Sequence, residues 1–187
     1  MVSTKTPVCN FGWKARDFSL VGVDGKTHNL ESVRGKNGTI VMFICNHCPY
    51  VKAILDRLVR DVRELQKIEI GVVGIMSNDP SEYPEDSFNN MKYISNQYGF
   101  TFPYVIDPTQ HTAHSYDAVC TPDFFGFDKN LELRYRGRFD SSRKEASSKN
   151  AKRELYDAMV EVAKSGKGPT HQIPSMGCSI KWIGKNS

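Results

Sequence analysis

Two continuous apolar runs stand out in the first half of the chain. Residues 39–45 and Ile70–Met76 carry few polar side chains, and runs of this length without alternation are typical of strands buried on both faces of a sheet. Between them, apolar residues recur at helical spacing, which predicts a helix over about 48–67. A strand, a helix and a second strand in this order predict a right-handed crossover and a parallel pair, with 39–45 as the central strand.

Alternating segments nearer the two ends predict antiparallel hairpins. Residues 15–21 and 26–30 flank Asp24 and Gly25, a turn signal for a hairpin. A second hairpin is expected from Asp123–Phe127 and 131–136. The remaining periodic segments predict helices at Phe88–Tyr98, 109–118 and 151–164 and a short strand at 102–106.

The end of the chain is too apolar for a solvated tail. Residues 170–187 include Ile173, Met176, Ile180 and Trp182, so we expect this segment to fold back across the domain. Cys178 lies within it and becomes a candidate for a specific contact.

Length and composition favour one globular domain. With 187 residues, 39% hydrophobic and 25% charged, the chain is expected to form a single domain with a core at about 10–165 and a C-terminal extension at 166–187. No apolar run approaches the roughly 18 residues of a membrane-spanning helix. Because the N-terminal residues lack the apolar segment of a secretory signal, we expect a cytoplasmic protein without a membrane partner.

The charge of the chain gives no sign of nucleic-acid binding. A net charge of +4 is spread over interleaved acids and bases. Arg134, Arg136 and Arg138 alternate with other residues, as on the outer face of a strand, and no recognition motif accompanies them. We therefore expect no nucleic-acid partner.

The strongest chemical signal is the sequence Cys45-Asn46-His47-Cys48-Pro49, placed between the first apolar run and the predicted helix. Backbone N–H groups and the dipole at a helix start favour the thiolate, the form of cysteine that is nucleophilic and binds metals. Two cysteines at this spacing can also form a disulfide with each other. Five cysteines, an odd number, do not form a structural disulfide framework, and Cys9 is interpreted as an incidental thiol.

These features together resemble the thioredoxin-like fold, and more closely its peroxiredoxin-like branch. The resemblance rests on the Cys-x-x-Cys between strand and helix, on Arg16-Asp-Phe-Ser-Leu20 and on Cys120-Thr-Pro-Asp-Phe-Phe125. It implies an α/β fold with a central mixed sheet flanked by helices, an N-terminal hairpin and a C-terminal extension. It also implies a cis-proline at Pro122, a substrate-facing backbone at Thr121, and a position for Cys120 near the cysteine pair as a third thiol.

The chain departs from the peroxiredoxin pattern at two positions. Cys48 matches the peroxidatic cysteine of that family, but Val41 and Cys45 stand where the family has Pro and Thr or Ser. The hydroxyl that helps to bind peroxide is thus replaced by a second thiol. The sequence therefore favours dithiol exchange over peroxide reduction.

The predicted activity is thiol–disulfide exchange with protein or small-molecule disulfides and thiols, supported by a separate reductant and requiring no cofactor. We expect Cys45, taken as the more exposed thiol, to attack and Cys48 to resolve the mixed disulfide. A positive charge on His47 is expected to lower the pKa of Cys45, which makes the couple less reducing than thioredoxin. Thr39 stands where thioredoxins carry a buried acid, so His47 or water is expected to transfer protons.

Two alternatives stay open at this point. One is a thiol peroxidase with Cys48 as peroxidatic cysteine and Cys45 or Cys120 as resolving cysteine. The other is a protein that binds zinc or copper through several cysteines, with a histidine as a further ligand. The candidate ligands for that alternative are Cys45, Cys48, Cys120, Cys178, His111, His114 and His171. A bound metal is not part of the favoured prediction.

Overall fold

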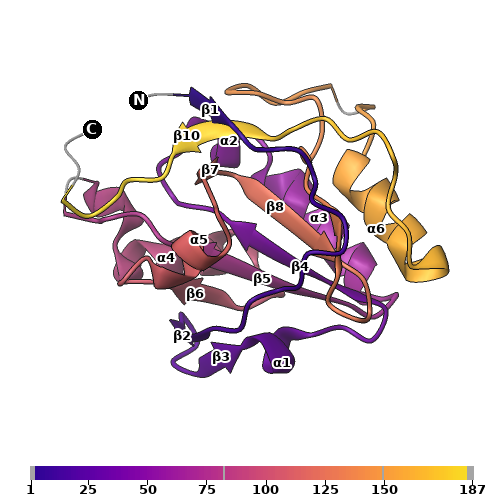
Figure 1. Ribbon diagram of the computed structural model, residues 1–187. Coiled ribbons are helices and arrows are strands. Elements are labelled where there is room, and N and C mark those ends of the chain that lie inside the picture. Colours follow the sequence, from indigo (N-terminus) through magenta and orange to yellow (C-terminus); the bar gives the residue numbers. More distant parts are fainter. Residues whose placement is uncertain (1–2, 82, 149, 185–187) are drawn as a thin grey trace.

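A mixed β-sheet forms the centre of the computed structural model, which describes residues 3–81, 83–148 and 150–184 (Figure 1). Within those residues seven strands make up this sheet. In order across the sheet they are β3 (Thr27–Asn29), β2 (Ser19–Gly22), β6 (Tyr104–Ile106), β5 (Ile70–Met76), β4 (Gly38–Phe43), β8 (Asp123–Phe127) and β9 (Leu133–Tyr135).

The strand pairing follows the sequence pattern closely. β4 and β5 are parallel, with Ile40 opposite Val72, as the predicted crossover requires. Both expected hairpins are present, because β2 pairs with β3 and β8 pairs with β9 in antiparallel fashion. β4 lies between β5 and β8 and is buried along its whole length, which explains its lack of polar residues.

Helices cover both faces of this sheet. Along β4, Ile40 and Met42 point into one core with residues of α3 (Leu55–Gln66), α4 (Phe88–Tyr98) and α6 (Glu154–Ser165). Val41 and Phe43 point into a second core with residues of α1 (Leu30–Val33) and α5 (His111–Ser115). The alternation of side chains along one strand therefore supplies both layers.

The predicted helix at 48–67 is wrong as one continuous element. The chain forms α2 (Pro49–Lys52) and then α3, with a turn at Ala53 and Ile54 between them. The Ile54 N–H bonds to the Val51 carbonyl rather than to the residue four positions back. The break lets α2 contact the C-terminal strand while α3 packs on β5 and α6.

Several other elements are shorter than expected. The helix predicted at 109–118 is reduced to α5 because Gln110 and Asp117, which flank it, both have positive φ angles, 61° and 49°. Left-handed backbone of this kind cannot continue a helix. α6 likewise begins at Glu154 rather than at 151, and η1 (Pro84–Asp86) is a short 3₁₀ turn that the sequence did not indicate.

The C-terminal segment folds back across the domain, as its apolar residues predict. It forms β10 (Met176–Ser179), which pairs with β1 (Ser3–Lys5) on one side and with β7 (Cys120–Thr121) on the other. In Figure 1 the yellow β10 runs beside β1 and across α2. A Cβ added at Gly177 would lie 2.0 Å from the Thr121 carbonyl oxygen, so only glycine permits this close approach of β10 to β7.

In the part of the chain that the structure describes, no helix has both the length and the apolar character needed to span a bilayer.

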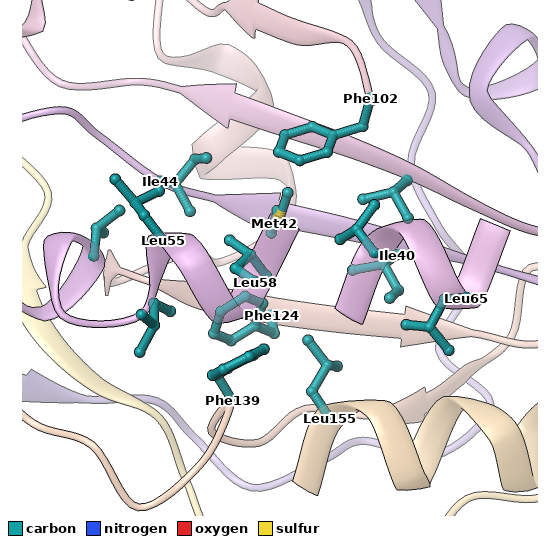
Figure 2. Close-up of a cluster of buried hydrophobic side chains, with 14 of the residues drawn as sticks. Ile40, Met42, Ile44, Leu55, Leu58, Leu65, Phe102, Phe124, Phe139 and Leu155 are labelled. Atoms are coloured by element: carbon teal, nitrogen blue, oxygen red, sulfur yellow. The ribbon is translucent and has the colours of Figure 1, made fainter. Parts of the chain in front are cut away.

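The packing of α3 on the sheet gives a test of the core. Figure 2 shows Leu58 beside Met42 and Phe124, and all three side chains are fully buried in the same cluster. Leu58→Ala is expected to lower the free energy of unfolding by about 2–5 kcal/mol, since it removes buried methyl groups and leaves a cavity. Urea unfolding measures the change.

The control is Ile68→Ala, just after α3, where the side chain is 36% exposed. It is expected to cost less than about 1 kcal/mol. Equal costs for the two variants would contradict the packing described here.

Candidate functional site

The cysteine pair lies on the loop that joins β4 to α2. Cys48 is the N-cap residue of α2, and its carbonyl accepts hydrogen bonds from the N–H groups of Val51 and Lys52. Pro49 occupies the first helical position, where its missing N–H costs nothing. The strand, the loop and the helix start thus place both thiols at one end of β4, as the sequence predicts.

Both thiols are buried, so the structure does not single out Cys45 as the exposed thiol that the sequence predicts. Cys45 is 1% and Cys48 0% exposed. The covering group is Thr121, whose hydroxyl lies 3.2 Å from Cys45 Sγ and whose carbonyl oxygen lies 3.1 Å from Cys48 Sγ, where it accepts a hydrogen bond while Cys48 is protonated. The Thr121–Pro122 peptide bond is cis. The loop that the sequence singled out as substrate-facing therefore lies directly on the two sulfur atoms.

A third sulfur joins the pair, and it comes from the C-terminal strand. Cys178 Sγ lies 3.0 Å from Cys48 Sγ, and Cys178 stands opposite Thr121 in the pairing of β10 with β7. The Cys120 thiol instead donates to the Pro122 carbonyl at 3.6 Å. Cys120 as third thiol stays a prediction, whereas Cys178 is the thiol in contact with Cys48.

The loop is fixed by a buried carboxylate, Asp86, that the sequence pattern does not indicate. Asp86 is 0% exposed, and one of its oxygens accepts hydrogen bonds from the backbone N–H groups of Asn46, at 2.8 Å, and His47, at 3.1 Å. Its other oxygen accepts a 2.8 Å bond from the Asn78 side chain. Asp86 lies in an acidic, proline-rich stretch typical of a solvated loop, and only the η1 turn carries it inward.

His47 lies next to Cys45 but is directed at Asp86. Its Nδ1 is 2.6 Å from an Asp86 oxygen and 3.8 Å from Cys45 Sγ. The imidazole also stacks on the ring of Tyr83, with centroids 4.5 Å apart. His47 Nε2 is buried and has no hydrogen-bond partner among the described residues. The carboxylate therefore sets the orientation of the ring.

The Cys45 and Cys48 thiols differ in pKa because their surroundings differ. Burial raises the pKa of Cys45, and its contacts with Cys48 and the Asp86 charge raise it further. The pKa of Cys48 is lowered, because its thiolate accepts hydrogen bonds from the thiols of Cys178 and Cys45. The prediction that the pKa of Cys45 is lowered by His47 is therefore wrong, because burial and the Asp86 charge raise that pKa. Of the two thiols, Cys48 is the one favoured as a thiolate.

Of the candidate metal ligands named from the sequence, only Cys45 lies in a possible metal-binding group among the described residues. Among the described residues, Cys45, His47 and Asp86 form a buried group whose potential ligand atoms lie within 4.8 Å of one another. Thiolate, imidazole and carboxylate are donors that suit zinc. However, His47 and Asp86 are hydrogen-bonded to each other in this group, and a cation would have to replace that bond.

The other candidate histidines are not part of this group. His111 and His114 are exposed on α5, and His114 stacks on Trp182 with ring centroids 4.1 Å apart. His171 is exposed and borders a separate pocket together with Cys9. The side chains that converge on the cysteine pair are thus Thr121, Cys178, His47 and Asp86.

A pocket of about 150 Å³ opens beside the site. Its lining includes Tyr50, which follows Cys48 closely in the chain, Pro122 of the cis-proline loop and Met176 of β10. Lys5 and Arg143 add positive charge to its lining. None of the cysteines lines this pocket, so a substrate bound there would be next to the thiols but still separated from them.

Comparison with known proteins places this geometry in context. The sequence is similar to the thiol–disulfide oxidoreductase ResA of Geobacillus thermodenitrificans (strain NG80-2), with 29% identity over 126 residues, or 66% of each chain. The chain thus matches just under two thirds of that relative's length.

Two solved structures extend the comparison. The crystal structure of an uncharacterised conserved protein from Geobacillus kaustophilus covers 100% of this chain and 99% of its own, with 40% identity and a TM-score of 0.93. A secreted Mycobacterium tuberculosis disulfide oxidoreductase covers 76% of this chain and 94% of its own, with 15% identity and a TM-score of 0.59. The latter shares the fold alone, and it confirms the predicted thioredoxin-like architecture.

The sequence profile of the AhpC/TSA family matches residues 11–136. That range holds the central sheet, the Cys45/Cys48 pair and the Thr121–Pro122 loop, but not α6 or β10. The match spans more than half of the chain, and the fold agrees with it; the protein belongs to the AhpC/TSA family, in the thioredoxin-like superfamily.

Proposed function

We propose that this protein is a thiol–disulfide oxidoreductase whose redox dithiol is Cys45 and Cys48. One observation carries the proposal: two thiols on a strand-to-helix loop lie against Thr121, Cys48 at its carbonyl and Cys45 at its hydroxyl, and neighbouring thiols lower the pKa of Cys48. A stabilised thiolate next to a second thiol is what disulfide exchange requires. The similarity to a relative named as a thiol–disulfide oxidoreductase supports the same function.

The order of events reverses the roles expected from the sequence. The Cys48 thiolate attacks one sulfur of a substrate disulfide, that S–S bond breaks, and the second substrate sulfur leaves as a thiolate. Cys45 then gives up its proton and attacks Cys48 Sγ, which releases the first substrate sulfur. The substrate disulfide gains two electrons, and Cys45 and Cys48 end as a disulfide.

His47 and Asp86 stand where the proton of Cys45 has to move. With its high pKa, Cys45 is held as a thiol until the mixed disulfide forms. The His47 Nδ1 atom lies 3.8 Å from the Cys45 sulfur. We propose that His47 and Asp86 together receive the proton. They would take the role of the buried acid that thioredoxins carry at the position of Thr39.

Access to the sulfurs calls for a movement of the covering segments. Because Cys45 and Cys48 are buried under Thr121 and β10, a substrate reaches them when these segments part. The pocket beside Pro122 and Tyr50 is the proposed docking place, and its partners are disulfides and thiols, protein or small-molecule. A separate reductant completes the cycle, and the cytoplasmic location remains a prediction.

Replacing the sulfur that is proposed to attack gives the direct test. Cys48→Ser is expected to reduce insulin disulfides no faster than buffer, because it removes the nucleophile. Cys9→Ser, which changes a half-buried thiol lining a separate pocket, is expected to keep the wild-type rate. Turbidity of the reduced insulin chains measures both.

Two results would contradict the proposal. A Cys48→Ser protein that accumulates a mixed disulfide on Cys45 would restore Cys45 as the attacking thiol. The second result is a wild-type protein that consumes hydrogen peroxide rapidly but leaves insulin unreduced. It would favour the thiol peroxidase alternative, which also uses Cys48, and hence an antioxidant role instead of disulfide exchange.

The lowered pKa of Cys48 has its own pH signature. Since its folded-state pKa lies below that of an ordinary thiol, about 8.5, Cys48 is expected to be a thiolate throughout neutral pH and to lose the charge only in acid. Thiolate absorbance in the ultraviolet, recorded as the difference between wild type and Cys48→Ser, follows it. A difference that appears only as the pH rises above 8 would disprove the assignment.

A further inference from the structure

Cys178 lies outside the part of the chain that matches the family, yet its sulfur contacts the redox pair. The family match ends at residue 136, whereas Cys178 is on β10 with its Sγ 3.0 Å from Cys48 Sγ. Cys178 is 2% exposed and Cys48 0%. Two sulfurs this close are in reach of a bond with little backbone movement.

The surroundings of Cys178 hold it in this position. The residue before it, Gly177, has no side chain, which lets β10 approach the Thr121 carbonyl. Two residues further back, the Ser175 hydroxyl donates to the Pro122 carbonyl at 2.7 Å. On the other side, the Lys181 N–H donates to the Asn78 side chain at 3.0 Å. β10 is therefore fastened to the cis-proline loop and to the loop after β5, on both sides of Cys178.

Cys48 occupies the middle of the three sulfurs. Its Sγ lies 3.0 Å from Cys178 Sγ and 3.1 Å from the Thr121 carbonyl oxygen, and a hydrogen bond with the Cys45 thiol lowers its pKa. Cys45 and Cys178 reach it from different parts of the chain, one from the end of β4 and one from β10. Either one can therefore serve as the partner of Cys48.

We infer that Cys178 is a third redox thiol, which resolves mixed disulfides on Cys48 and exchanges with Cys45 for the disulfide bond to Cys48. This inference rests on the proposed function of the Cys45/Cys48 pair and extends it. The site then has two oxidised forms, Cys45–Cys48 and Cys48–Cys178. In the second form the C-terminal strand is covalently tied to the active-site loop.

The exchange of the Cys45–Cys48 disulfide for the Cys48–Cys178 disulfide needs no atoms or electrons from outside the protein. The Cys178 thiol loses its proton and its thiolate attacks Cys48 Sγ in the Cys45–Cys48 disulfide. The new Cys48–Cys178 bond forms, the Cys45–Cys48 bond breaks, and Cys45 leaves as a thiolate that takes up the proton. No electrons are gained or lost overall, so no further oxidant is needed. With a substrate disulfide on Cys48 in place of Cys45, the same attack releases the substrate thiolate.

Trypsin separates the relevant cysteines, which allows a direct test. Cys45 and Cys48 share the peptide 37–52, Cys178 lies in 168–181 and Cys120 in 93–129. The folded Cys45→Ser protein is treated with oxidised glutathione, alkylated in acid and digested without reductant. Mass spectrometry is expected to find 37–52 linked to 168–181 and no lasting glutathione on Cys48. The matched double variant Cys45→Ser with Cys178→Ser is expected to keep the glutathione adduct.

Other outcomes overturn the inference. Glutathione that persists on Cys48 in Cys45→Ser, or a link from 37–52 to the Cys120 peptide 93–129, removes Cys178 from the redox site. If circular dichroism shows that Cys45→Ser does not fold, oxidised wild-type protein decides: linked 37–52 and 168–181 support the inference, and their absence contradicts it.

The same digests keep this inference separate from the proposed function. Wild-type protein that forms the disulfide within 37–52 and reduces insulin, but never links 168–181, retains the exchange function and excludes Cys178. If the wild-type protein forms neither a glutathione adduct nor a disulfide at Cys45 or Cys48, the proposed thiol–disulfide exchange is itself contradicted.

Discussion

The contact of β10 with the cis-proline loop is the constraint on which the site depends. Thr121 is the point where three parts of the chain meet: its carbonyl and hydroxyl face Cys48 and Cys45, and it stands opposite Cys178 in β10. The strand pairing and the glycine at 177 bring the three together. Without the C-terminal strand, the cysteine loop would lose part of its cover and the Cys178 sulfur that lies 3.0 Å from Cys48 Sγ.

Asp86 supplies the second fixed point of the site. Four hydrogen bonds reach its two oxygens, two from backbone N–H groups of the cysteine loop and two from side chains. A buried carboxylate of this kind is costly unless it is fully bonded. Here it holds the loop between the cysteines and raises the pKa of Cys45. The same group therefore fixes the geometry and keeps the two thiols chemically different.

Much of the fold and the centre of the site could be predicted from local pattern. The apolar runs that became β4 and β5, the two hairpins and the Cys-x-x-Cys at a helix start all depend on neighbouring residues. What could not be predicted depends on contacts between distant segments. Asp86 looked like a loop acid until η1 buried it, Cys178 meets Cys48 across 130 residues, and exposure of Cys45 depends on the cover that Thr121 provides. The pattern of apolar residues also did not predict the helix ends that are set by residues with left-handed backbone, such as Gln110 before α5.

Hydrogen bonds from neighbouring thiols stabilise the Cys48 thiolate and hence the reduced form of the site. The reduction potential of the dithiol reports this stabilisation, and it is measured by equilibration with glutathione buffers followed by acid-quenched alkylation. A couple whose reduced form is stabilised is a better oxidant, so we expect a potential clearly less reducing than that of thioredoxin, about −270 mV. A potential as reducing as about −270 mV or more so would contradict it.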